Sequence, residues 1–148
     1  MSTYKKILVA IDSTDEADEV IAAAEVIARQ NDAKVHLLTV VKPIHYAYTG
    51  YESVGAYSGF QTFEAQAQAA ALANLTDRAE RLGQSEDQVA VIVGKPSVAI
   101  KEHAKNLNVD LIVMGSHGRH GIGLLLGSTA NGVLHGAPCD VMTVRIST

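Results

Sequence analysis

Apolar and polar positions along the chain follow two alternating periods. Short, nearly continuous apolar runs rich in β-branched residues are typical of strands covered on both faces. Five such runs predict strands over residues 6–12, 34–41, 88–94, 109–115 and 139–147. Between them, apolar residues recur every three or four positions, as they do on one face of a helix. This pattern predicts helices over residues 13–32, 62–83, 96–108 and 129–136.

Residues with special backbone preferences mark the ends of these predicted helices. Ser13 and Glu16 have the spacing of a capping box, and Pro96 suits a first helical position. Gly83 and Gly136 are typical of helix stops. The alternation of strands and helices predicts one domain over residues 1–148, an α/β fold with a mostly parallel five-stranded sheet and right-handed crossovers.

One segment fits neither period. From Lys42 to Gln61 the chain holds four tyrosines and three glycines without a clear repeat. We expect a long surface loop there. Two roles stay open for it: a plain solvated loop, or a lid or partner-contacting segment.

Composition excludes several classes of protein. The net charge is −4 and no Lys/Arg cluster is present, which argues against nucleic-acid binding. The longest apolar runs are too short to span a bilayer, so we expect no membrane insertion, and the first residues lack the pattern of a signal peptide. The single cysteine, Cys139, fits a reducing cytoplasm and is expected to be a small buried apolar residue, with a reactive thiol as the alternative.

Polar and glycine-rich segments stand where two strands should end. Asp12 follows the first strand, and the sequence Gly-Ser-His-Gly from Gly115 to Gly118 follows the fourth. In open parallel sheets, ligands bind outside the carboxyl ends of the strands. Glycines allow close approach to an anion, and helix N-termini present amides to it. Arg119 and the Gly-Ser-Thr sequence that begins at Gly127 complete a candidate phosphate cradle, with a flexible structural loop and a capping role for Asp12 as the alternatives.

Other single residues favour structural roles. His117 and His120 are three positions apart, but no cysteine or carboxylate accompanies them, so we expect no metal site of protein ligands alone. No Ser-His-Asp arrangement is evident, so we expect no catalytic residue. His103 is expected to be structural or solvent-facing, and Asp110 is expected to be solvent-exposed at the head of a strand.

Several motifs together carry a resemblance to a known family. They are "KKILVAID", "VGKP", "VDLIVMGSHGR", "LLLGSTANGVL" and "APCDVMTVR", which extend over essentially the whole chain. The chain thereby resembles the universal stress protein family. The resemblance implies a Rossmann-like open five-stranded parallel sheet with strand order 3-2-1-4-5 and helices on both faces.

The family divides into ATP-binding and non-binding members, and the resemblance implies a set of nucleotide-binding positions. They are Ala10, Ile11, Asp12, Val40, Met114, Gly115, His117, Gly118, Arg119, Gly127, Ser128 and Thr129. Binding members carry two glycines separated by two residues, then nine residues, then Gly-Ser or Gly-Thr. Here eight residues separate Gly118 from Gly127, and Gly121 and Gly123 could absorb the deletion.

Two further departures from the ATP-binding pattern bear on whether the chain resembles the binding or the non-binding members. Ala10 and Ile11 stand where binding members often have Pro-Thr, and the "YTG" that begins at Tyr48 resembles the non-binding class. The glycine loop, which that class lacks, is nevertheless present. The resemblance therefore implies binding of ATP, or of AMP or ADP, with Mg²⁺ or Mn²⁺ as an accompanying ion near Asp12.

The expected function is that of a cytoplasmic stress-response sensor or regulator with at most a very slow ATPase activity. The resemblance also implies a homodimer through the C-terminal strand from Asp140 to Ile146, with Val144 near its centre, and leaves room for a regulated protein partner. The alternative is a nucleotide-free protein-interaction module. A small hydrolase using Ser116 or Ser128 is a third reading.

Overall fold

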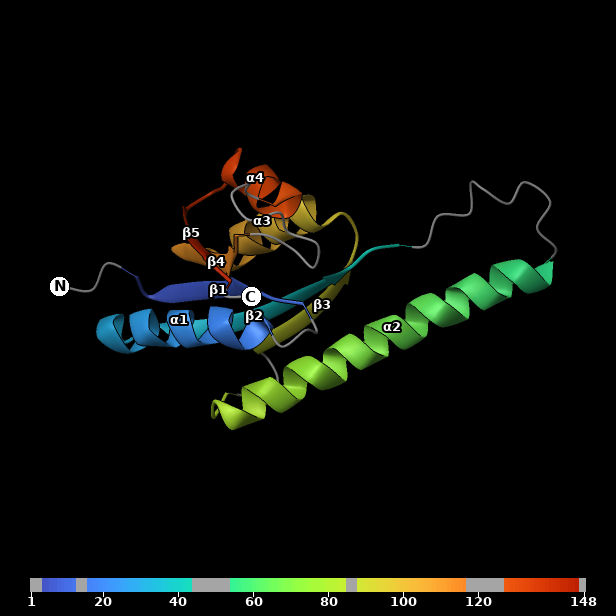
Figure 1. Cartoon of the computed structure of the whole chain (residues 1–148), viewed down its shortest axis with the longest axis horizontal. Helices are drawn as coiled ribbons and strands as arrows, with labels where there is room; N and C mark the ends of the chain where they lie inside the picture. The colour runs from blue at the N-terminus through green and yellow to red at the C-terminus, as the bar shows by residue number, and fades with distance from the viewer. Residues whose placement is uncertain (1–3, 13–15, 44–53, 85–87, 117–126, 147–148) are drawn as a thin grey trace.

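Helices on both faces enclose a five-stranded sheet in the computed structural model (Figure 1). The structure describes residues 4–12, 16–43, 54–84, 88–116 and 127–146, with only the backbone described over residues 54–62. The strands are β1 (Lys6–Ala10), β2 (Lys34–Val41), β3 (Val89–Val93), β4 (Leu111–Gly115) and β5 (Asp140–Val144). The helices are α1 (Glu16–Asn31), α2 (Val54–Arg81), α3 (Pro96–Leu107) and α4 (Ser128–Leu134).

The strand order is β3-β2-β1-β4-β5, and every neighbouring pair is parallel. Both the parallel sheet and the order 3-2-1-4-5 are therefore confirmed. The central strand β1 lies between β2 and β4, and Ala10 near its end pairs with Leu38 on one side and Met114 on the other. The carboxyl ends of β1 and β4 consequently lie side by side.

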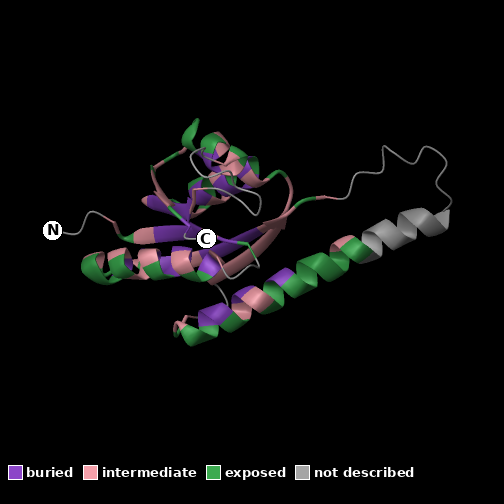
Figure 2. Cartoon of the chain, in the orientation of Figure 1, coloured by how far each residue is buried: buried purple, intermediate pink, exposed green. Residues whose placement is uncertain are grey.

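Successive residues of a strand point to opposite faces of the sheet, and each face has its own core. Ile7 and Val9 of β1 pack with the buried residues of α1 and α2. Leu8, between them in sequence, packs on the other face with residues of α3 and α4, such as Ile100 and Val133. Figure 2 shows these buried positions on the central strands and on the helix surfaces that face them.

Helix α2 begins earlier than the sequence predicted. The expected loop from Lys42 to Gln61 is wrong from Val54 onward, because α2 starts there. Residues 42–43 have no regular structure, and residues 44–53 lie outside the described residues. Glycine in a helix costs about 1 kcal/mol, but adding residues to an existing helix gains a hydrogen bond each time. The helix thus extends through glycine-containing sequence and projects beyond the sheet, where Phe63 is 65% exposed (Figures 1 and 2).

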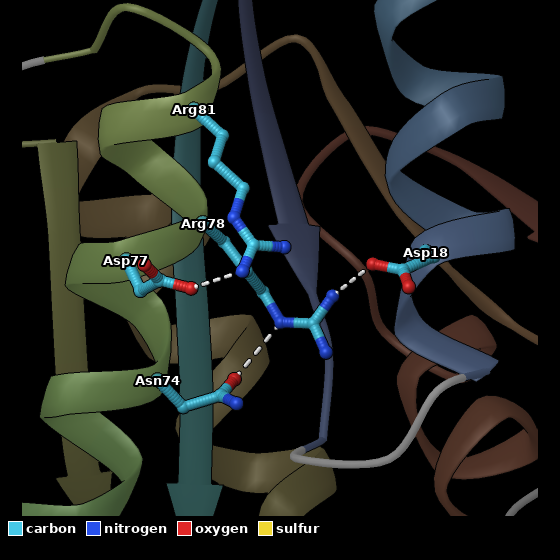
Figure 3. Close-up of polar contacts among 5 residues, drawn as sticks. All are labelled: Asp18, Asn74, Asp77, Arg78 and Arg81. Atoms are coloured by element: carbon cyan, nitrogen blue, oxygen red, sulfur yellow. Dashed lines mark hydrogen bonds and ion pairs between the residues drawn. The ribbon is translucent and has the colours of Figure 1, made fainter.

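The other end of α2 is fixed to α1 by a largely buried arginine. The guanidinium of Arg78 forms an ion pair with the carboxylate of Asp18 on α1, and its Nε donates to Oδ1 of Asn74 at 2.9 Å (Figure 3). Beside this contact lies a shallow groove of about 180 Å³ between the two helices. Both arginines that line the groove form ion pairs with aspartates, Arg78 with Asp18 and Arg81 with Asp77 at 2.7 Å. We therefore interpret the groove as part of the packing between α1 and α2.

Side chains close the edge of the sheet where the strands begin, called here the amino edge. Oδ2 of Asp110 accepts hydrogen bonds from the backbone N–H groups of Lys5 and Lys6, at 2.7 and 2.9 Å. The hydroxyl of Tyr4 donates to Oδ2 of Asp140 at 2.9 Å. The expectation that Asp110 is simply a solvent-exposed residue is therefore wrong, since its carboxylate ties the start of β1 to the start of β4.

Candidate functional site

The opposite edge, where the strands end, is called here the carboxyl edge, and it brings the predicted site segments together. Beyond β1, the backbone N–H of Ile11 donates to the carbonyl of Leu38 at 2.9 Å, which holds the chain against β2 for one more residue. Asp12 then lies exposed beside the end of the sheet. On the neighbouring strand, the N–H of Ser116 donates to the carbonyl of Val144 at 2.8 Å. Both segments therefore reach this edge in fixed positions.

A backbone hydrogen bond joins the two residues that flank residues 117–126 of the glycine-rich segment. The N–H of Gly127 donates to the carbonyl of Ser116 at 2.6 Å. Residues 117–126, between them, lie outside the described residues. The two ends of that segment thus meet at the end of β4, and the start of α4 is placed there with them.

The first turn of α4 offers backbone donors at this point. The first N–H groups of any helix have no acceptor within the helix. Gly127 is the N-cap residue, with an extended backbone and no side-chain capping bond. Ser128 is exposed and Thr129 half-buried, so two hydroxyl groups accompany these amides. Such a helix start is suited to an anion, although with seven residues α4 carries only a short macrodipole.

The remaining predicted site residues do not all lie on the same face of the sheet. Ala10 and Val40 are half-buried on the face covered by α3 and α4, and Met114 is buried there. Ile11 is 8% exposed and packs into the core beneath α1 and α2, so its side chain points to the opposite face. Gly115 ends β4 at the same edge. His117, Gly118 and Arg119 lie outside the described residues.

The pKa values of Cys139 and His103 are shifted for clear physical reasons. Burial raises the pKa of the Cys139 thiol, and the negative charges of Asp140 and Asp110 raise it further. Cys139 was expected to be buried; it is half-buried near the amino edge and packs against the core that α3 and α4 cover. Burial lowers the pKa of His103 on α3. Neither group belongs to the carboxyl edge.

Two other features are absent from the described residues. No group of three or more His, Cys, Asp or Glu residues among them could hold a metal ion. No helix within those same residues is long and apolar enough to cross a membrane.

Two residues that support α4 were not singled out from the sequence. Nζ of Lys101 on α3 donates to the carbonyl of His135, at the end of α4, at 2.9 Å. Gly132, in the middle of α4, lies against Ser97 of α3. The sequence did contain a signal for Gly132, because an isolated glycine within a predicted helix often permits close packing against another element.

Comparison with known proteins gives consistent matches over the chain. A sequence model of the universal stress protein family matches residues 3–145. The chain is 42% identical over 147 residues to universal stress protein A homolog 2 of Coxiella burnetii, covering 99% of this chain and 98% of that protein. It is similar to the structure of universal stress protein UspA from Lactobacillus plantarum, with 26% identity, a TM-score of 0.76 and coverage of 99% and 100%. A universal stress protein solved in complex with cAMP gives 28% identity, a TM-score of 0.64 and coverage of 99% and 100%.

Proposed function

The chain belongs to the universal stress protein family, and on that premise we propose that it binds an adenine nucleotide, ATP or its relatives AMP and ADP, at the carboxyl edge. The observation that carries this proposal is the hydrogen bond from the N–H of Gly127 to the carbonyl of Ser116. It supports the view that the glycine-rich segment, although one residue shorter than usual, still starts and ends at the strand ends beside Asp12. The relative that was solved with cAMP supports an adenine nucleotide as the ligand class.

Each part of the nucleotide has matching chemistry among the described residues. The first amides of α4 and the hydroxyl groups of Ser128 and Thr129 are donors for phosphate oxygens. Asp12, an exposed carboxylate, is suited to a ribose hydroxyl or to an Mg²⁺ or Mn²⁺ ion held mainly by the phosphates. Ala10 and Val40 provide half-buried apolar surface for the base.

The glycine-rich segment would complete the site. We propose that Gly118 permits close approach of the backbone to the phosphates, that His117 faces the ligand and that Arg119 supplies positive charge. Gly115 and Met114 precede this segment at the end of β4 and would form the floor of the site.

The role that follows is a cytoplasmic sensor or regulator in the stress response, not an efficient enzyme. Fast phosphoryl transfer needs a positioned base or water-orienting group together with charge-neutralising cations. Asp12 and Arg119 are the groups that the sequence offers for these tasks. We therefore propose ligand-dependent binding of a protein partner, with ATP hydrolysis that is very slow at most.

One observation favours the alternative of a nucleotide-free interaction module. Ile11 turns its side chain into the core beneath α1 and α2, so only its backbone is available at the carboxyl edge. Family members that bind ATP often have a Pro-Thr pair at this point. If the wild-type protein binds no nucleotide, this second function takes precedence.

We also propose a homodimer formed through β5 and the residues that follow it, from Asp140 to Ile146. β5 lies at an edge of the sheet, and such edges tend to be covered or paired. Because the carbonyl of Val144 accepts from Ser116, the polar backbone groups of Val144 face β4 and those of Thr143 face outward. Thr143→Pro should therefore release folded monomers, as judged by light scattering and circular dichroism. A wild-type mass of one chain would contradict the dimer.

The direct experiment is to denature the purified protein and analyse the released small molecules by mass spectrometry, followed by calorimetry with ATP, ADP, AMP and cAMP. We expect an adenine nucleotide to be released or bound. Gly118→Val should block binding without unfolding the protein. Gly94→Ala, where an added Cβ meets no atom within 4 Å, is the matched control. Wild-type protein that binds no adenine nucleotide at millimolar concentration would end the proposal.

A further inference from the structure

α4 approaches α3 so closely at Gly132 that a side chain has no room. A Cβ atom added at Gly132 would lie 2.7 Å from Cβ of Ser97 and 2.9 Å from its Oγ. Real Cβ atoms do not make contacts this short. Apart from the chain neighbours of Gly132 and the backbone of α4 itself, no other heavy atom of the described residues lies within 4 Å of that point. The contact is therefore specific to one pair of residues.

Ser97 cannot move away easily. It is the second residue of α3, directly after Pro96, and it is 8% exposed. The first turn of α3 is closed by a hydrogen bond from the N–H of Ala99 to the carbonyl of Lys95, at 2.9 Å. Rotation of the side chain would move Oγ, but Cβ is fixed to the backbone. A substitution at Gly132 must therefore displace α4 itself or distort α3.

α4 is held at three other places. At its start, the N–H of Gly127 donates to Ser116, and at its end the carbonyl of His135 accepts from Nζ of Lys101. Between these points, Ala130 and Val133 are buried against the sheet. Because these contacts oppose a shift of the whole helix, we expect a push at Gly132 to tilt α4 and so to displace its first turn.

We propose that Gly132 is a positioning residue for nucleotide binding: its missing side chain lets α4 lie against Ser97, and this contact sets the position of the first-turn amides that receive the phosphates. The inference rests on the proposed function for its ligand, but the placement of α4 by Gly132 can be measured without one. Gly132 acts through α4 and does not touch the nucleotide.

Helix propensity alone predicts the opposite effect on stability. Alanine is a better helix former than glycine, so Gly132→Ala would raise the melting temperature if the site were open. The contact with Ser97 predicts that the melting temperature does not rise. The change in the melting temperature of Gly132→Ala therefore shows whether close packing or helix propensity dominates at this position.

The experiment uses four variants of the full chain: Gly132→Ala, Ser97→Gly, the double variant and Gly94→Ala as the open-site control. We expect Gly132→Ala to weaken ATP binding about tenfold, a loss that calorimetry resolves readily. The double variant, which removes both Ser97 atoms, should return to within about twofold of Ser97→Gly. Rescue of this kind is not expected if alanine at position 132 weakens binding without contacting Ser97.

A second measurement makes the inference independent of the ligand. In the ligand-free protein, Gly132→Ala should shift the NMR resonances of the backbone amides of residues 127–130, and the double variant should restore them. If these amides do not move and ATP binding equals that of the wild type, the inference is overturned. If the wild type binds no nucleotide but the amides move, the proposed function fails while the placement of α4 by Gly132 stands. Should Gly132→Ala fail to fold, the double variant must fold, or the inference fails.

Discussion

The two edges of the sheet are built in opposite ways. At the amino edge, the protein's own side chains receive the backbone donors: Asp110 accepts from Lys5 and Lys6, and Asn31 accepts from the N–H of Tyr4 at 3.3 Å. At the carboxyl edge, the first turn of α4 follows a glycine that has no side chain to cap it. The amino edge is thus closed by side-chain contacts, whereas among the described residues the start of α4 has no side-chain cap from its N-cap residue.

Because of this difference, we expect substitutions at the amino edge to change folding stability and substitutions at the carboxyl edge to change ligand affinity. Buried polar groups lower the free energy of the folded state only when they are paired. At the amino edge the carboxylate of Asp110 is paired with two backbone donors, one of them in a partly buried contact, so its removal should cost folding free energy. If the donors at the start of α4 bind a nucleotide as proposed, changes there should affect ligand affinity and leave folding nearly unchanged.

The largest effect is expected from Asp110→Ala. This change removes two charge-assisted hydrogen bonds, and a hydrogen bond to a charged group contributes about 1.5–3 kcal/mol. Because the site is partly exposed, we expect a loss of about 2 kcal/mol in the free energy of unfolding, measured by urea denaturation. ATP affinity should stay the same. Glu102→Ala, at an exposed carboxylate of α3, is the control, and equal stability of the two variants would contradict the role of Asp110.

A matched pair of hydroxyl deletions tests the carboxyl edge. Ser128→Ala should weaken ATP binding about tenfold and leave the melting temperature unchanged, because Ser128 is exposed at the start of α4. Tyr4→Phe removes the hydroxyl that donates to Asp140 at the amino edge, and it should leave the ATP affinity unchanged. Calorimetry and thermal denaturation on both variants provide the measurement. Weaker binding in Tyr4→Phe than in Ser128→Ala would reverse the assignment of the two edges.

The thiol at the amino edge should be unreactive. Burial raises the pKa of Cys139, and the charges of Asp140 and Asp110 add to the effect, so little thiolate exists at neutral pH. We expect iodoacetamide at pH 8 to alkylate the native protein about tenfold more slowly than the urea-unfolded chain. Asp140→Asn should speed the native reaction. Equal rates in native and unfolded protein would show that Cys139 is accessible and unperturbed.

The smallest effect concerns pH. Burial lowers the pKa of His103, so the unfolded chain takes up a proton at a higher pH than the folded protein does. Its contribution to stability is therefore complete above the ordinary histidine pKa of about 6.5 and decreases as the pH falls toward the folded value. His103→Gln should show a slightly smaller loss of stability between pH 7.5 and 5.5 than the wild type, measured by urea denaturation. An identical loss would show that His103 is not protected from protonation.

Local sequence patterns predicted the order of strands and helices well, because apolar periodicity reports burial directly. The parallel sheet followed from the alternation, but the order 3-2-1-4-5 came from the family resemblance, since periodicity alone does not choose among parallel arrangements. The early start of α2 at Val54 was missed because glycines and tyrosines hide a helix that propagates from its alanine-rich part.

The contacts of Asp110 and Gly132 were beyond prediction for a different reason. Asp110 accepts from Lys5, a residue 105 positions away in the sequence, and Gly132 meets Ser97 on another helix. Such pairs arise only when separate elements pack together. By contrast, the candidate site at Asp12, Gly115 and Gly127 could be proposed from sequence, because strand ends and glycines mark it locally.

Hydrogen–deuterium exchange with and without saturating ATP compares the two edges in one measurement. We predict slower exchange of the amides at residues 115–116 and 127–130 in the presence of ATP. The amides of Lys5 and Lys6, already bonded to Asp110, should exchange at the same rate in both samples. Protection at the carboxyl edge alone would support nucleotide binding there. Unchanged exchange at residues 127–130, or protection confined to the amino edge, would contradict it.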